Sequence, residues 1–237
     1  MNDTFLLLHS PLIGPYSWMP VADELRRRGH RAIVPSFLHA LRRSSGFTEA
    51  ISRSVAEEIA KANLVGRLFL VPHSAAGAFT PALRQAIAAP VHGYIFVDAR
   101  FPTVGQSLSE DDPPHAVEHR SAMARKGFLP PWSEWFGEQA MKEVIPDDTR
   151  RQRFVKELQR VPLALFTESI PVPSEWPEAP CAYLRLSDSY IPLAARAETS
   201  GWTVAELDVQ HMHMLVDEVQ VTEHILDLAG RLAKRRE

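Results

Sequence analysis

The stretch 67–79 most constrains the fold of this chain, because an apolar run leads through small residues into a helical pattern. The run from Leu68 to Val71 is too short for a buried helix and predicts a strand buried on both faces. From Phe79 onward, apolar residues recur every four positions, as on one face of a helix. Ser74 lies between these elements, where a sharp turn would present its hydroxyl at the carboxyl end of a sheet.

The residues around Ser74 approximate the nucleophile-elbow motif G-x-S-x-G. The chain has Pro72 and Ala76 at the two glycine positions. Alanine meets the need for a small residue, whereas proline is unusual there. The alternative is that Ser74 only caps the following helix.

Strands alternate with helices along most of the chain, which predicts an α/β fold with a mostly parallel six-stranded sheet and helices on both faces. We expect helices to begin near Ser17, Thr48 and Asp217, in addition to the one after Ser74. The six strands are predicted at residues 4–8, 31–34, 68–71, 91–97, 182–186 and 202–207.

The alternation stops between residues 101 and 180, where proline, tryptophan and charged residues are frequent. A loop of this length without structure is improbable in a compact domain, so we expect an inserted helical cap, or lid, over the active site. Residues 1–100 and 181–237 would form the core. Aromatic residues in the cap suggest an apolar or aromatic substrate, although each ring could equally pack the cap onto the sheet: Phe128, Trp132, Trp135, Phe136 and Trp176.

Charge and composition favour a protein whose substrate is a small molecule. The net charge of −3 and the absence of a basic stripe argue against nucleic-acid or anionic-membrane partners. Cys181 is the single cysteine, so an intrachain disulfide is excluded. Without a leader or a bilayer-length apolar segment, we expect a cytoplasmic location; a homodimer is left open.

Two further residues complete a candidate triad with Ser74. A serine hydroxyl needs a base within hydrogen-bond reach and a group that orients the base. Asp188 follows the fifth predicted strand and His211 follows the sixth. This is the chain order serine, acid, histidine.

Three segments together resemble the α/β-hydrolase fold superfamily, in the branch that contains plant methyl esterases and hydroxynitrile lyases. Residues 9–18 resemble its H-G-x-x-x-G-x-x-x-W loop, residues 188–192 its D-x-x-x-P acid loop, and residues 211–215 its H-x-x-x-L histidine loop. The resemblance implies that Ser74 is the nucleophile, His211 the general base and then acid, and Asp188 the orienting carboxylate.

Each of these assignments has an alternative. Asp98 ends the fourth predicted strand at the same sheet edge, and some family members take their acid from that position. His213 could replace His211 as the base. His73 is expected to pack behind the elbow.

The oxyanion hole departs from the family pattern of two backbone N–H donors. Ala75 can supply the first. The position expected to supply the second is Pro11, which has no N–H, so Leu12 would have to donate instead. Ser10 replaces the family glycine, and hydroxynitrile lyases have a substrate-contacting hydroxyl there.

The sequence therefore predicts a serine hydrolase that cleaves an ester, thioester or lactone of a small apolar molecule through an acyl-enzyme. We expect no cofactor and no metal. One alternative is a lyase or cyclase that uses the same serine, histidine and aspartate. The other is a ligand-binding protein on a hydrolase scaffold.

Overall fold

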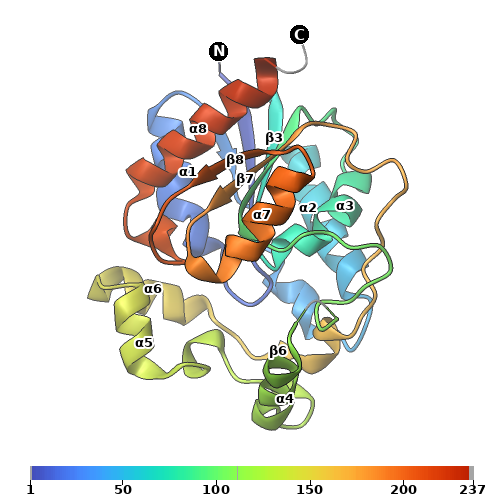
Figure 1. Cartoon of the computed structure of the whole chain (residues 1–237), viewed down its shortest axis with the longest axis vertical. Coiled ribbons are helices and arrows are strands. Elements are labelled where there is room, and N and C mark those ends of the chain that lie inside the picture. Colours follow the sequence, from blue (N-terminus) through green and yellow to red (C-terminus); the bar gives the residue numbers. More distant parts are fainter. Residues whose placement is uncertain (1, 111, 235–237) are drawn as a thin grey trace.

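A six-stranded parallel sheet forms the centre of the computed structural model, which describes residues 2–110 and 112–234 (Figure 1). Its strand order is β2-β1-β3-β4-β7-β8. The strands are β1 (Thr4–Leu8), β2 (Arg31–Ile33), β3 (Leu68–Ser74), β4 (Gly93–Ala99), β7 (Cys181–Arg185) and β8 (Thr203–Glu206). The predicted α/β fold with a six-stranded parallel sheet is confirmed.

Successive side chains along each strand point to opposite faces of this sheet, and both faces are buried in hydrophobic clusters. Phe5 and Leu7 pack in one hydrophobic cluster, and Leu6 and Leu8 pack in another. The first cluster includes residues of α1 (Met19–Arg27) and α8 (Glu218–Lys234). The second includes residues of α2 (Phe47–Lys61), α3 (Ala76–Gln85) and α7 (Ile191–Thr199). Short 3-10 helices η1 (Pro15–Trp18) and η2 (Leu38–Arg42) lie in the connections after β1 and β2.

The segment 101–180 contains short helices and a second, two-stranded antiparallel sheet rather than strands of the main sheet. In Figure 1 its helices lie at the end of the molecule opposite the start of β1 and the end of α8. Its elements are α4 (Pro114–Met123), β5 (Phe128–Leu129), η3 (Trp132–Glu134), α5 (Gly137–Val144), α6 (Asp148–Glu157), β6 (Val161–Pro162) and η4 (Leu163–Phe166).

Two carboxylates tie this segment to the core. Glu157 Oε2 accepts a hydrogen bond from Tyr16 N–H at 2.7 Å. Glu168 accepts the N–H groups of Gly46, Phe47 and Thr48 at 2.7–3.1 Å. The second contact places a negative charge at the N-terminus of α2, where the helix dipole favours it.

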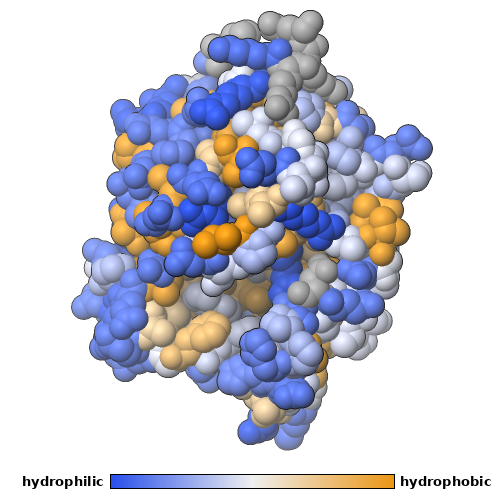
Figure 2. Space-filling model, in the orientation of Figure 1, coloured by the Kyte–Doolittle hydropathy of each residue, from blue (hydrophilic) through white to orange (hydrophobic). Residues whose placement is uncertain are grey.

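The surface is largely hydrophilic on the face drawn in Figure 2, with hydrophobic residues scattered over it. Among the described residues, no helix combines the length and apolar character required to cross a bilayer.

Candidate active site

Ser74 ends β3 in a left-handed backbone conformation with φ of 56°. This conformation is strained for a residue with a side chain, at a cost of order 1–3 kcal/mol. Ala75 and α3 follow immediately. The sharp turn also needs a glycine, since a Cβ on Gly77 would lie 2.1 Å from the carbonyl oxygen of Arg100. This strand–turn–helix geometry is the elbow predicted from the sequence.

Asp98, near the end of β4, has a fully buried side chain and a φ of 40°. Its Oδ1 accepts the Leu186 N–H at 2.6 Å. Its Oδ2 accepts the Ser187 hydroxyl at 2.6 Å and lies 2.9 Å from Nδ1 of His211. The Ser187 N–H lies 3.1–3.2 Å from the two carboxylate oxygens. These donors hold the carboxylate in a fixed position against His211.

His73 also holds His211 in place. The ring of His73 packs against it with centroids 4.4 Å apart, and Nε2–H of His73 donates to the His211 carbonyl oxygen at 3.1 Å. Burial, followed by repulsion from His211, lowers the pKa of His73 well below its usual value. His73 is therefore neutral at pH 7 and packs behind the elbow, as the sequence suggested.

Asp188 does not orient His211, contrary to the sequence prediction. Its side chain is 90% exposed, and its charged neighbour is Arg185 at 3.8 Å. Arg185 also pairs with Glu206 and Asp208. Asp188 lies in η5 (Asp188–Tyr190), which turns its carboxylate outward, and the alternative carboxylate, Asp98, occupies the position beside His211.

His213 is directed elsewhere. Its Nε2 lies 2.9 Å from Oε1 of Gln220 in α8. Of the two histidines considered for the base, His211 is thus the one that contacts a buried carboxylate.

The loop after β1 also differs from the expected oxyanion arrangement. The Leu12 N–H donates to Oγ of Ser10 at 3.3 Å. The expectation that Leu12 directs its N–H toward the elbow is therefore not supported. Ser10 itself is buried, and its hydroxyl proton is not used by that bond.

Tyr190 is a site residue that the sequence reasoning missed. It is the last residue of η5, and its ring stacks on His211 with centroids 5.0 Å apart and planes 5° from parallel. Its hydroxyl lies 3.5 Å from Oγ of Ser74. The available signal was its place two residues after Asp188, in the loop already expected at the site.

A cavity of about 470 Å³ borders Tyr190. Its other lining residues come from the loop between β4 and α4, from η5 and from the start of α7: Arg100, Phe101, Asp112, Pro113, Ser189, Pro192 and Leu193. Most of these side chains are apolar, and the Arg100 guanidinium is paired with the Asp112 carboxylate.

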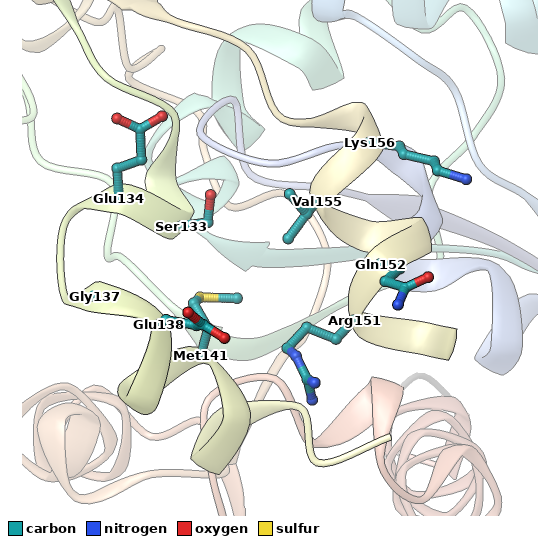
Figure 3. A pocket seen from close by; sticks show the side chains of 9 residues that line it. All are labelled: Ser133, Glu134, Gly137, Glu138, Met141, Arg151, Gln152, Val155 and Lys156. Carbon is teal, nitrogen blue, oxygen red and sulfur yellow. The ribbon is translucent and has the colours of Figure 1, made fainter. Parts of the chain in front are cut away.

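A second cavity, of about 570 Å³, lies between α5 and α6 (Figure 3). Met141 and Val155 point into it from the two helices, and no residue of the Ser74 site lines it. Of the aromatic residues expected to roof the site, Trp132 and Trp135 both pack on Phe136. Trp132 contacts Phe136 and Phe154, whereas Trp176 contacts Tyr94, Phe96 and Trp202 beside the sheet.

No metal-binding group of three or more His, Cys, Asp or Glu side chains occurs within residues 2–110 and 112–234.

Solved structures with the same fold cover almost the whole chain. An extracellular alpha/beta-hydrolase from a Paenibacillus species, described as sharing structural and functional homology with tobacco salicylic acid binding protein 2, is 18% identical with a TM-score of 0.77, over 96% of this chain and 99% of that chain. A pyrethroid hydrolase from Sphingobium faniae JZ-2 is 20% identical with a TM-score of 0.73, over 99% and 100% of the two chains. Polyneuridine aldehyde esterase is 17% identical with a TM-score of 0.71, over 97% and 100%.

At these identities the likeness establishes the fold. No curated protein matches the sequence. The family model for the alpha/beta hydrolase family matches residues 5–223, which includes the main sheet, apart from the first residue of β1, and the residues gathered around Ser74. The chain therefore belongs to the alpha/beta hydrolase family.

Proposed function

We propose that this protein is a serine-dependent hydrolase that cleaves an ester, thioester or lactone of a small apolar molecule through an acyl-enzyme. Membership of the family supports a hydrolase. The observation that carries the proposal is the contact of His211 with buried Asp98. Tyr190 connects this pair to the elbow serine, since its ring stacks on His211 and its hydroxyl lies 3.5 Å from Oγ of Ser74.

In this proposal Ser74 is the nucleophile, His211 the base and Asp98 the orienting carboxylate. A carboxylate only accepts hydrogen bonds, so the bond to Asp98 places the proton of neutral His211 on Nδ1. Nε2 is then left with a lone pair that can take the Ser74 proton. This is the role that an aspartate performs in a serine–histidine–aspartate triad, by fixing the tautomer and stabilising the imidazolium.

The substrate class is inferred from the cavity beside Tyr190. Phe101, Pro113 and Leu193 give it apolar walls, and its volume of about 470 Å³ suits a small molecule. Asp112 and Pro113 in this wall belong to the segment 101–180. We therefore assign that segment the role of a cap over the site, with residues 1–100 and 181–237 as the core.

A lyase or cyclase that uses the same site is the second candidate. Pro11 has no N–H, and the Leu12 N–H is hydrogen-bonded to Ser10. A weak oxyanion hole would favour chemistry without an acyl-enzyme, in which His211 transfers protons and Ser10 or Ser74 holds the substrate.

Labelling with a fluorophosphonate probe, followed by mass spectrometry, tests the proposed function. We expect the probe to modify Ser74 in the wild type and not in Ser74→Ala or His211→Ala. Ser121→Ala, which removes an exposed hydroxyl on α4, is the matched control and should label normally. Absence of label on folded wild-type protein would contradict the acyl-enzyme and favour the lyase or cyclase.

A further inference from the structure

Tyr190 contacts two residues of the proposed triad with one side chain. Its hydroxyl lies 3.5 Å from Oγ of Ser74, and its ring lies parallel to the ring of His211. The stacking on His211, which is itself held by Asp98, restricts where the hydroxyl can lie. Tyr190 therefore presents a hydrogen-bonding group to the atom that would attack the substrate.

The site needs such a group because its set of backbone donors is incomplete. Ala75 can donate its N–H as the residue after the nucleophile. Pro11 cannot donate, and the N–H of Leu12 lies 3.3 Å from Ser10 Oγ. Neither of the two residues expected to supply the second donor therefore directs an N–H at the developing negative charge, as acyl-transfer enzymes do.

The position of the Tyr190 hydroxyl suits this missing role. In a tetrahedral intermediate, the oxyanion and Oγ of Ser74 would be bonded to the same carbon. A donor 3.5 Å from Oγ can therefore lie within hydrogen-bond distance of the oxyanion.

The phenol of Tyr190 also stays in the donating form. Burial raises its pKa to about 12, against the opposing effect of the hydrogen bond with Ser74. The hydroxyl thus keeps its proton throughout the range in which a histidine base operates.

We propose that Tyr190 is a catalytic residue whose hydroxyl donates a hydrogen bond to the oxyanion, in place of the second backbone N–H. This inference rests on the proposed function. As Ser74 Oγ bonds to the carbonyl carbon, its proton moves to Nε2 of His211 and the π electrons move onto the carbonyl oxygen. Tyr190 keeps its proton and stabilises that charge.

The later steps use the same bond. When the intermediate collapses, the bond to the leaving group breaks with its electron pair, and His211 returns the proton to that group. Water then adds to the acyl-enzyme and gives its proton to His211, while Tyr190 stabilises the second oxyanion in the same way. This intermediate collapses by breaking the bond to Ser74 Oγ, which takes the proton back from His211 as the acid product leaves.

Tyr190→Phe tests the inference, because it removes the hydroxyl and keeps the ring stacked on His211. We expect kcat on acyl esters to fall about 100- to 1000-fold, as when an oxyanion donor is lost, with KM nearly unchanged. The rate of fluorophosphonate labelling should fall with it, while the pH profile set by His211 is retained. Tyr94→Phe is the matched control, since the Tyr94 hydroxyl bonds to Glu178 near the start of β4 and should not affect kcat.

The possible results separate this inference from the proposed function. If wild-type Ser74 does not label, the proposed function fails. If it labels and Tyr190→Phe is equally fast, faster, or altered only in KM, the role of Tyr190 is overturned and the acyl-enzyme stands.

A fluorinated tyrosine at position 190 preserves the shape of the side chain and provides a test if Tyr190→Phe does not fold. Its phenol has a lower pKa, so kcat should decrease as the phenol ionises within the assay range. A pH profile identical to that of the wild type would contradict the inference.

Discussion

Nδ1 of His211 lies 2.9 Å from Oδ2 of Asp98, and the Asp98 side chain is fully buried. The same carboxylate accepts the Leu186 N–H and the Ser187 hydroxyl. The first residues after β7 thus stabilise an acid supplied by β4. The loop after β7 is left free to contribute Tyr190 instead.

Asp98→Asn should therefore reduce activity strongly, and Asp188→Asn should not. We expect kcat/KM to fall about 10³- to 10⁴-fold for Asp98→Asn, because the amide can no longer fix the His211 tautomer. Asp188 is exposed and only weakly paired with Arg185, so its variant should remain within about twofold of the wild type. Steady-state kinetics on acyl esters measures both. A larger loss in Asp188→Asn than in Asp98→Asn would restore the assignment made from the sequence.

His211→Ala and His213→Ala form a second discriminating pair. Removal of His211 should lower kcat about 10³-fold or more, since the nucleophile loses its base. His213 bonds to Gln220 in α8, so its removal should change stability slightly and leave kcat close to that of the wild type. Rates of fluorophosphonate labelling report the difference directly. Equal losses in both variants would indicate a general effect on the loop that carries them.

The sequence predicted the elements that depend on local pattern. Apolar runs located the strands of the sheet, including the one that ends at Ser74. The serine itself was identified from its place between a strand and a helix. The choice of acid was not accessible in this way, because Asp98 and Asp188 both follow buried strands. It depends on side-chain direction, which the left-handed backbone at Asp98 and the outward turn at η5 determine. Tyr190 was missed for a similar reason, since its contact with Ser74 spans 116 positions of sequence.

Buried histidines should make the protein less stable in mild acid. Burial lowers the pKa of His9 to about 4 and that of His73 well below its usual value. Between pH 6.5 and 4 the unfolded chain then binds more protons than the folded one, so the free energy of unfolding decreases as the pH falls. His9 alone contributes about 3 kcal/mol to this decrease by pH 4.

Urea denaturation at a series of pH values between 7 and 4.5 checks this prediction. We expect His9→Gln to show a shallower decrease than the wild type, because it has no group to protonate. Carboxylates make a smaller contribution in this range. At Asp3, for example, burial raises the pKa of the carboxyl, but hydrogen bonds from Arg67 hold that pKa below its usual value. An identical slope in the two proteins would show that His9 does not control acid stability.

The close contact of α3 with the loop after β4 makes Gly77 a site where even one methyl group is costly. A Cβ there would lie 2.1 Å from the Arg100 carbonyl oxygen and 2.9 Å from its nitrogen, and both atoms belong to the backbone. Because neither can move without displacing the turn at Ser74, we expect Gly77→Ala to destabilise the protein by about 3 kcal/mol or more and to slow labelling of Ser74.

Gly230→Ala is the control, since a Cβ on this residue of α8 meets no atom within 4 Å. That variant should be more stable by about 0.5–1 kcal/mol, through higher helix propensity. Equal unfolding free energies for the two variants in urea would contradict the tight packing at the elbow.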